Sequence, residues 1–318
     1  MIQKRKAIFI AGPTASGKSQ LALEIATFLQ NQTQIIQQPQ KQIAIINCDS
    51  VQVYQDLLIG SASPEQSEKD LFPHYLYNYL QFPQEISLGN YYRDFAELIS
   101  KLDPSCVLIV VGGSGFYLQA LEQGLFDMPP VPVHLRSEIQ EDLLKKGAAV
   151  LYEELMAGDP ETAQRIHIND HYRLTRALEV LRGQQTTLTK AAMNRQKSFD
   201  LDVLKIALRL SKQELHSRVT ARTKFMMKKG IVEETAEMLA KGRNEWAPLS
   251  SVGYLETKNF LQGNIASVGV LESLIIQKTM QLIKKQMTWF KSDSAIHWRT
   301  IDQTLDSQLQ IKDFLLGA

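Results

Sequence analysis

GPTASGKS, residues Gly12–Ser19, lies between an apolar run, Ala7–Ala11, and a helical pattern, Gln20–Gln30. The octapeptide matches G-x-x-x-x-G-K-[ST], a phosphate-binding loop between a strand and a helix. In such loops the backbone N–H groups and the first helical turn face an anion, and the lysine adds a mobile positive charge. The sequence therefore predicts a site for a polyphosphate or diphosphate group. The predicted phosphate-binding residues are Gly12, Pro13, Thr14, Ala15, Ser16, Gly17, Lys18 and Ser19, and the Ser19 hydroxyl is also placed to ligate Mg²⁺ together with the phosphates.

The composition is that of an ordinary globular protein. The chain has 318 residues, of which 44% are hydrophobic, and this length suits one large domain or a core with an inserted subdomain. No apolar run approaches the roughly twenty residues that span a bilayer, so we expect a cytoplasmic protein without a membrane segment. Cys48 and Cys106 stand in apolar, strand-like contexts and are expected to be buried thiols. The glutamine-rich stretch Gln30–Gln42 is expected to be a surface insertion.

Charge is unevenly distributed along the chain. The formal net charge is +1, but residues 200–300 contain 16 lysines and arginines against 10 aspartates and glutamates. This excess is consistent with a polyanionic partner, and equally with a solvated surface. The charge count alone leaves both interpretations open.

Strand-like segments alternate with helical patterns. After the first strand, Ile43–Ser50 and Cys106–Val111 each contain an apolar run that predicts a buried strand. Strands separated by helices in this way predict a parallel, doubly wound sheet. Because ligands bind at the carboxyl ends of such strands, Gly12–Ser19, Asp49–Gln52 and Gly112–Ser114 are expected to meet at one site.

A long segment without strand signals, residues 121–199, interrupts this pattern. Its most regular helix is predicted at His171–Gly183, while Val203–Leu210 returns to a strand and Leu271–Phe290 forms a final long helix. We therefore predict an α/β fold with a P-loop NTPase-like parallel sheet core and an inserted all-helical subdomain. The predicted core is 1–120 plus 200–318, and the predicted insertion is 121–199.

Asp49 is the most informative residue outside the phosphate loop. An acidic residue after a buried strand, beside a phosphate-binding loop, can hold Mg²⁺ through water or act as a general base. It can also cap a helix N-terminus. Ser50, Gln52 and Tyr54 add polar and aromatic groups nearby, and such groups suit a nucleobase.

Several blocks of sequence extend these observations over most of the chain. They are GPTASGKS, CDSVQVYQDLLIGSASP, PHYLYNYL, VVGGSGFYLQALEQG, RIHINDHYRLTRALEV, SVGYLE and KKQMTWFK. In their order and approximate spacing they resemble the tRNA dimethylallyltransferase family, also called tRNA isopentenyltransferase. The resemblance runs from the first strand to the final helix and leaves out the glutamine-rich stretch and the C-terminal tail.

The resemblance implies transfer of a dimethylallyl group from dimethylallyl diphosphate to the exocyclic amine of the adenosine immediately 3′ of the anticodon (tRNA position 37), with release of diphosphate. The phosphate loop would then hold a leaving group, with Mg²⁺ neutralising its charge. Asp49 matches the family's base, and Arg222 matches an arginine aimed at the diphosphate. Ser114 stands where the family commonly has threonine and keeps a hydroxyl. The implied catalytic residues are thus Asp49, Ser114 and Arg222, although without the resemblance Arg222 would more simply be a solvent-facing charge on an amphipathic helix.

The implied partner is the tRNA anticodon stem-loop, bound by a monomer. The adenosine would leave its stack and enter a channel open at both ends. Tyr172, Arg176 and Tyr254 would suit stacking on unpaired bases, whereas Trp289 and Phe290 are expected in the core or the groove wall. The implied tRNA-binding residues are Asp49, Ser50, Val51, Gln52, Ser114, Arg136, Tyr172, Arg173, Leu174, Thr175, Arg176, Leu249, Ser250, Ser251, Val252, Gly253, Tyr254, Lys284, Lys285, Gln286 and Lys291.

Two other activities are compatible with parts of the sequence. An adenylate isopentenyltransferase, which prenylates free nucleotides, would share the phosphate loop and the base but would not need the inserted helices or the basic C-terminal third. A P-loop kinase or a nucleotide-gated RNA-binding protein would share only the loop. A small-molecule kinase would usually have a lid with paired arginines, and we identify no such pair in the sequence.

Overall fold

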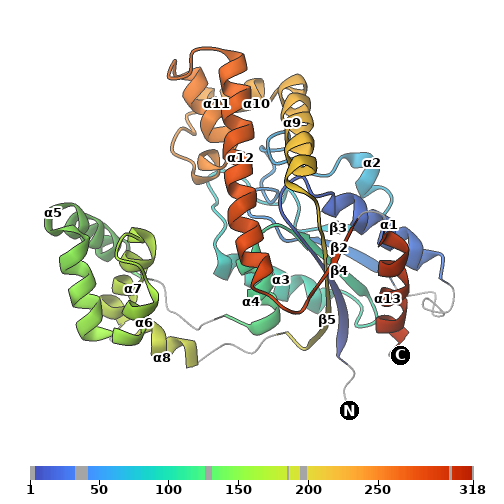
Figure 1. Ribbon diagram of the computed structural model, residues 1–318, viewed down its shortest axis with the longest axis horizontal. Coiled ribbons are helices and arrows are strands. Elements are labelled where there is room, and N and C mark those ends of the chain that lie inside the picture. The colour runs from blue at the N-terminus through green and yellow to red at the C-terminus, as the bar shows by residue number, and fades with distance from the viewer. Residues whose placement is uncertain are drawn as a thin grey trace. The chain divides into compact units, whose positions relative to one another are not determined.

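A computed structural model describes residues 4–32, 42–125, 131–184, 186–193, 199–300 and 303–316. The chain divides into two compact units (Figure 1). The first comprises residues 1–122 and 199–318, and the second comprises residues 123–198.

The first unit is built on a parallel sheet, to which the described residues contribute six strands. The strand order is β3-β2-β4-β1-β5-β6, and every neighbouring pair is parallel. The strands are β1 (Arg5–Ala11), β2 (Ile43–Asn47), β3 (His74–Tyr75), β4 (Val107–Gly112), β5 (Leu201–Leu208) and β6 (Ile296–Arg299). β1 lies between β4 and β5, so the phosphate loop that follows it starts in the middle of the sheet.

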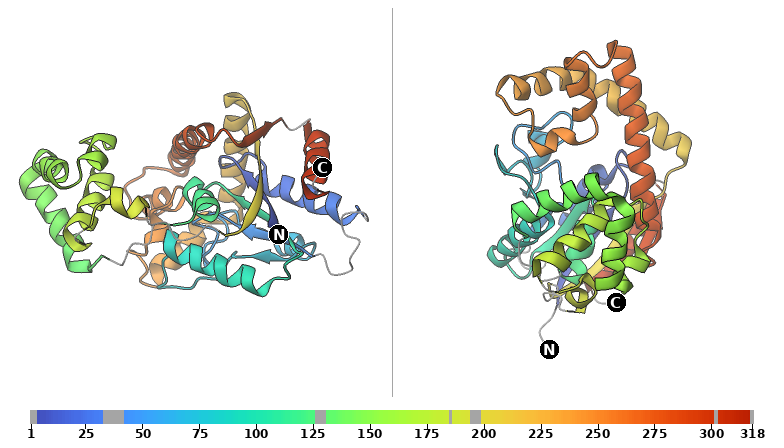
Figure 2. Two further views of the ribbon diagram at one scale, coloured as in Figure 1. Left: turned by 90° about the horizontal axis from the view of Figure 1, so that it is seen from below. Right: turned by 90° about the vertical axis from the view of Figure 1, so that its left-hand side faces the viewer.

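Helices cover both faces of this sheet. Ile8 and Ile10 point to the face covered by α1 (Lys18–Gln30) and α13 (Thr304–Leu316), whereas Phe9 between them points to the other face, because side chains alternate along a strand. Figure 2 shows α1 and α13 together on one side and α3 (Leu88–Lys101) on the opposite side. Burial on both faces explains why these strands have continuous apolar runs.

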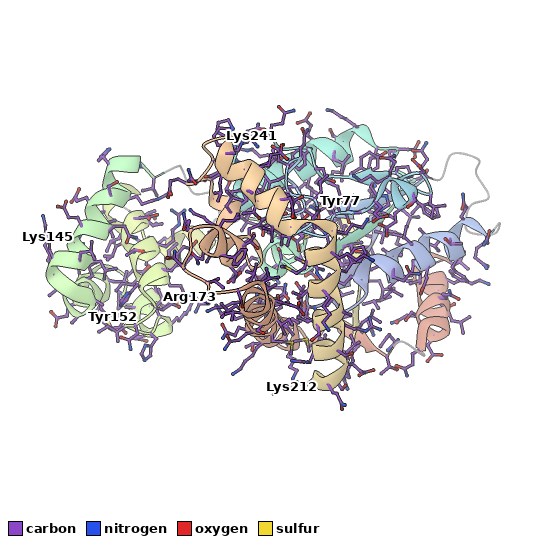
Figure 3. All side chains as sticks on the ribbon, turned by 90° about the horizontal axis from the view of Figure 1, so that it is seen from above. Tyr77, Lys145, Tyr152, Arg173, Lys212 and Lys241 are labelled. Atoms are coloured by element: carbon purple, nitrogen blue, oxygen red, sulfur yellow. The ribbon has the colours of Figure 1, made fainter. Side chains whose placement is uncertain are left out.

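The first unit has seven further helical elements among the described residues. α9 and α12 pack side by side, as Figure 1 shows, and Lys212 lies at the outer tip of α9 (Figure 3). These elements are α2 (Gln66–Lys69), α4 (Gly115–Gln123), α9 (Lys212–Lys229), α10 (Ile231–Ala240), the 3-10 helix η1 (Ala247–Ser250), α11 (Tyr254–Leu261) and α12 (Val268–Lys291). None of the helices formed by the described residues is both long and apolar enough to cross a bilayer.

The described part of the second unit is helical. It comprises α5 (Val133–Gly158), α6 (Pro160–Arg165), α7 (His171–Gln184) and α8 (Leu188–Met193). Gly147 adopts a left-handed φ of 79° and breaks α5 into two segments. Leu151, Leu174 and Leu178 are fully buried in the core that α5 and α7 share.

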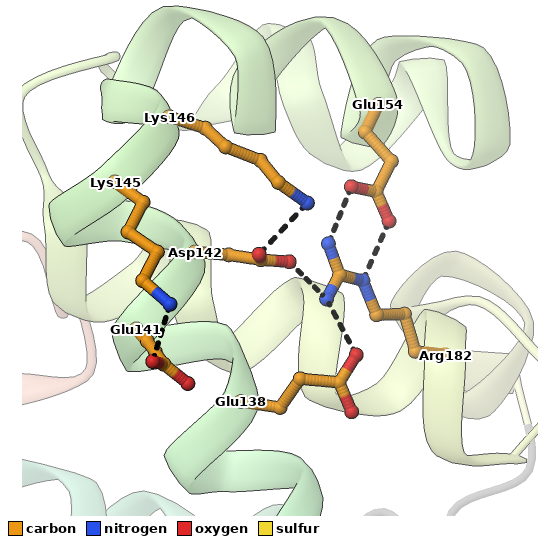
Figure 4. A network of polar contacts seen from close by, with 7 residues as sticks. All are labelled: Glu138, Glu141, Asp142, Lys145, Lys146, Glu154 and Arg182. Atoms are coloured by element: carbon orange, nitrogen blue, oxygen red, sulfur yellow. Dashed lines mark hydrogen bonds and ion pairs between the residues drawn. The ribbon is translucent and has the colours of Figure 1, made fainter.

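Arg182 of α7 joins the two segments of α5 (Figure 4). Its guanidinium binds Glu154 through two hydrogen bonds of 2.7 Å, and it donates to Asp142 at 2.8 Å. The Glu138 Oε1 lies 3.6 Å from the Arg182 Nη1, and the Lys146 Nζ lies 2.7 Å from the Asp142 Oδ1. The hydrogen bonds to Glu154, followed by the one to Asp142, raise the pKa of Arg182.

Replacing Arg182 with methionine should lower the free energy of unfolding by about 2 kcal/mol. The change leaves neighbouring carboxylates without their shared cation, although solvent screening keeps the cost below that of a fully buried pair. Urea unfolding followed by circular dichroism measures the effect. Arg165→Met is the matched control, because the Arg165–Glu161 pair is exposed on both sides. Equal losses in the two variants would contradict a special role for Arg182.

The structure confirms the predicted fold class, a P-loop-like parallel sheet with an inserted helical subdomain. Cys48 and Cys106 are buried free thiols, as expected. The sequence did not predict β3, β6 or α13. The prediction of a surface insertion at Gln30–Gln42 lies mainly on residues outside the described part of the chain, because residues 33–41 are not described.

Candidate functional site

The phosphate loop connects β1 to α1. Its backbone adopts left-handed φ values of 63° at Ala15 and 98° at Gly17, the residue before the helix. These turns direct the loop around the N-terminus of α1, where unsatisfied N–H groups and the helix dipole favour an anion. The Ser16 Oγ is buried without a hydrogen-bond partner among the described residues. A buried, unpartnered hydroxyl inside such a loop is suited to a phosphate oxygen.

Lys18 is held against the same loop. Its Nζ donates to the Pro13 carbonyl at 2.8 Å. Burial lowers the pKa of Lys18 to about 8, while the neighbouring Asp49 opposes this shift and Arg222 adds to it. The lysine, the aspartate and the arginine therefore lie close enough to sense one another's charge.

Asp49 follows β2 in a turn and does not cap a helix. Its Oδ1 accepts a hydrogen bond from the Val51 N–H at 2.9 Å. The buried Asn47 side chain accepts from the Asp49 N–H and donates to the Asp49 carbonyl, both at 3.0 Å. Asn47 therefore fixes the backbone of Asp49, and the Val51 N–H holds its carboxyl. Asn47 was not predicted as a site residue, because its only distinctive sequence feature is its position at the end of a buried strand.

Arg222 and Arg218 reach the site from α9. The Arg222 Nη2 donates to the Ser61 carbonyl at 3.3 Å, and the Arg218 Nη1 donates to the Ser16 carbonyl at 3.3 Å. Burial lowers the pKa of Arg222, and Asp49 opposes this shift. Residues four apart share one face of a helix, so the sequence spacing of the two arginines already indicated that both side chains point the same way. Arg218 was not predicted as a site residue.

Two neighbouring cavities meet at Asp49 and Arg222. The cavity at the phosphate loop has a volume of about 390 Å³ and is also lined by Lys18, Ser19 and Arg218. The second cavity has a volume of about 590 Å³ and is largely apolar. Its lining includes Ser50, Val51, Ser114, Phe116, Tyr117, Ser250, Ser251, Val252, Lys285 and Trp289. Both cavities are lined by Thr14, Asp49, Ser61 and Arg222. The three loops expected to meet at the strand ends therefore do so.

Gln286 and Gln52 have their amide groups bound inside the protein. The Gln286 Oε1 accepts from the Thr14 N–H, and its Nε2 donates to the Gly113 carbonyl, both at 3.0 Å. Gln286 thus ties the phosphate loop to the loop after β4. The Gln52 Nε2 donates to the Ser61 and Ala62 carbonyls at 3.2 and 2.8 Å. These bonds compete with the tRNA contacts that we expected of the two glutamines.

The other residues expected to bind tRNA differ in exposure. Lys284, Lys285 and Lys291 are exposed on α12, and none forms an ion pair with another described residue. Leu249 and Tyr254 are buried, as is Gly253. The expectation that Tyr254 stacks on a base is therefore wrong for this conformation, because its ring has no exposed surface. Trp289 is half-buried and lines the larger cavity, while Phe290 is fully buried.

In the helical unit, Tyr172 is 81% exposed and projects from the start of α7. The Arg176 Nη1 lies 2.6 Å from the Oε2 of the buried Glu179, and the Arg136 Nε of α5 lies 3.4 Å from the Oε1 of the same carboxylate. Arg173 is exposed (Figure 3). Leu174 and Thr175 are buried, and their contact with tRNA stays a prediction.

A protein-family model described as IPP transferase matches residues 52–293. The chain belongs to the IPP transferase family. Relatives in this family include the tRNA dimethylallyltransferase of Bdellovibrio bacteriovorus, which is 39% identical over 299 residues, covering 93% of each chain. The tRNA dimethylallyltransferase of a Synechocystis species is 34% identical over 93% of this chain and 91% of its own.

Solved structures share the fold of this IPP transferase family member. The tRNA isopentenylpyrophosphate transferase of Bacillus halodurans aligns with a TM-score of 0.69 and 23% identity, covering 99% of this chain and 98% of its own. A eukaryotic dimethylallyltransferase acting on tRNA aligns with a TM-score of 0.78 and 23% identity, covering 98% of this chain and 80% of its own. At these identities the likeness shows the fold, and the two units occur together in both relatives.

Proposed function

We propose that this protein transfers the dimethylallyl group from dimethylallyl diphosphate to the exocyclic amine of the adenosine 3′ of the tRNA anticodon (position 37). The observation that carries this proposal is the pair of cavities that meet at Asp49 and Arg222. One cavity has the basic, N–H-rich lining that suits a diphosphate, and the other has the apolar and aromatic lining that suits a prenyl chain and a base. The names of the relatives support the same activity.

In this proposal the bond between the allylic carbon and the diphosphate oxygen breaks as that carbon bonds to the adenine amine. Asp49 takes the amine proton, because the nitrogen lone pair is delocalised into the ring and attacks poorly without a base. The phosphate loop, Lys18 and Arg222 stabilise the diphosphate that leaves. Ser114 lines the cavity assigned to the base and prenyl chain, where its hydroxyl can donate to the donor substrate.

The phosphate loop also suits Mg²⁺. Ser19, which carries a hydroxyl, and Asp49, which carries a carboxylate, line the same cavity. Oxygen donors of this kind beside a diphosphate fit a small hard cation. When bound, Mg²⁺ would neutralise charge on the diphosphate. We assign Ser19, together with the substrate phosphates, as its ligands.

The tRNA surface in this proposal has a part on each unit. On the first unit it includes the exposed lysines of α12 and the residues Ser250–Val252 at the larger cavity. On the helical unit it includes Arg136, Tyr172, Arg173 and Arg176. Planar side chains such as Tyr172 suit stacking on unpaired bases. We further propose that the protein acts as a monomer in the cytoplasm.

A labelling assay distinguishes the candidate functions. Labelled dimethylallyl diphosphate and Mg²⁺ are incubated with the protein and either unmodified tRNA or free AMP. Label on tRNA but not on AMP is the expected result. Label on AMP alone would favour an adenylate isopentenyltransferase. Label on neither acceptor would favour a P-loop kinase or a nucleotide-gated RNA-binding protein.

Replacing both Lys284 and Lys285 with glutamine should weaken tRNA binding roughly tenfold at moderate salt. It should also reduce the slope of log affinity against log salt by about 1 to 2, because each phosphate contact contributes somewhat less than one unit. Fluorescence anisotropy at several salt concentrations measures both effects. Lys101→Gln, at an exposed lysine paired with Glu97, is the control. An unchanged salt slope would make the two lysines ordinary surface residues.

A further inference from the structure

The carboxylate of Glu234, on α10, accepts hydrogen bonds from a short segment of a distant loop. Its Oε2 accepts the N–H groups of Leu58 and Ile59, both at 2.8 Å. Its Oε1 accepts the Gly60 N–H at 3.2 Å and the Tyr254 hydroxyl at 2.5 Å. Three successive backbone donors and a phenol thus converge on one carboxylate. Hydrogen bonds to an ionised acceptor are stronger than those between neutral groups, so this arrangement fixes the backbone of the segment.

Tyr254 supports the segment from the other side. Its ring is fully buried, and a Cβ added to Gly60 would lie only 2.4 Å from the ring, so only glycine fits there. The Tyr254 hydroxyl also accepts the Gly60 N–H at 3.0 Å. Burial, followed by the negative charge of Glu234, raises the pKa of Tyr254. The phenol therefore remains protonated and continues to donate to Glu234.

The same segment reaches the candidate active site at Gly60 and Ser61. The Ser61 carbonyl accepts from the Arg222 Nη2 at 3.3 Å and from the Gln52 Nε2 at 3.2 Å. The Ser61 hydroxyl donates to the Leu57 carbonyl at 2.5 Å. Ser61 lines both cavities, whereas neither Glu234 nor Tyr254 lines either of them. The position of this carbonyl therefore depends on contacts outside the site.

We propose that Glu234 and Tyr254 are positioning residues that hold the segment Leu58–Ser61 so that Ser61 orients Arg222 toward the diphosphate. This inference rests on the proposed function, in which Arg222 binds the leaving group. It assigns Tyr254 a role through Arg222 in place of a contact with tRNA. A shift of about 1 Å in a binding group can cost on the order of 100-fold in rate, so a remote carboxylate can affect the reaction.

The test compares Glu234→Gln and Tyr254→Phe with the wild-type protein. Glu234→Gln removes the charge that holds the three N–H groups, and Tyr254→Phe removes only the hydroxyl. We expect each to weaken the affinity for inorganic diphosphate roughly tenfold and to lower kcat/KM for dimethylallyl diphosphate by a similar factor, with KM for tRNA unchanged. Glu233→Gln, at the adjacent exposed carboxylate, is the matched control and should change neither quantity.

A double-mutant cycle with Arg222→Ala tests the route of the effect. If Glu234 and Tyr254 act through Arg222, their effects on diphosphate affinity disappear when the arginine is absent. Fully additive effects, or a raised KM for tRNA with normal diphosphate affinity, would overturn the inference. Urea unfolding checks each variant, and Tyr254→Phe serves if Glu234→Gln does not fold. Diphosphate affinity can be measured without the transfer reaction. If the proposed function is wrong, the wild-type protein binds diphosphate but labels no tRNA, and this outcome is distinct from failure of the inference about Glu234 and Tyr254.

Discussion

Replacing Asp49 with asparagine should lower the rate of dimethylallyl transfer by a factor on the order of 100 or more. Asparagine keeps an oxygen that can accept the Val51 N–H, so the turn after β2 should survive. It cannot take the proton from the adenine amine, and the chemical step should therefore slow. Single-turnover transfer to bound tRNA measures this rate. Asp49→Ala should show at least the same loss, since it removes the carboxyl altogether.

The affinity for tRNA should be nearly unchanged in both variants, because a base acts in the transition state and contributes little to binding the ground state. Asp103→Asn is the control, since Asp103 is an exposed aspartate whose carboxyl also accepts a local backbone N–H, from Ser105. Weakened tRNA binding with normal turnover on bound tRNA would instead identify Asp49 as a recognition residue.

The parts of the fold that were predictable from sequence depend on local patterns. The phosphate loop is a continuous motif between a buried strand and a helix, and the strands β2 and β4 each consist of an apolar run. Parallel strands end at the same edge of a sheet, so the meeting of Asp49 with the phosphate loop could be expected once the strands were predicted to be parallel. By contrast, β3 has only two residues, His74 and Tyr75, and gives no periodic signal.

The roles of several side chains could not be predicted, because their partners are distant in sequence. Gln286 binds Thr14, 272 positions away, and Tyr254 binds Gly60, 194 positions away. A glutamine in a basic stretch and a tyrosine beside serines both suggest contact with nucleic acid. Only the packing of α12 and α11 against the core shows that these two side chains hold loops of the site. Arg218 was also missed, although it precedes Arg222 by four residues on α9 and therefore shares its helix face.

Replacing Arg222 with alanine should lower kcat/KM for dimethylallyl diphosphate by a factor on the order of 100 to 1,000, the usual cost of removing one donor from a charged leaving-group site. Arg222 lines both cavities beside Asp49, whereas Arg218 lines only the cavity at the phosphate loop. Arg218→Ala should therefore cost less, roughly tenfold. Steady-state kinetics with varied dimethylallyl diphosphate measures both effects.

A lysine at position 222 separates charge from geometry. Arg222→Lys keeps the positive charge but loses the planar group that binds two phosphate oxygens at once and reaches the Ser61 carbonyl. We expect it to recover only part of the activity lost in Arg222→Ala. Lys224→Ala, at an exposed position on the same helix, should leave the kinetics unchanged. Equal losses of kcat/KM for Arg222→Ala and Arg218→Ala would mean that the two arginines act only through their charge. The position of Arg222 at the junction of the two cavities would then have no special role.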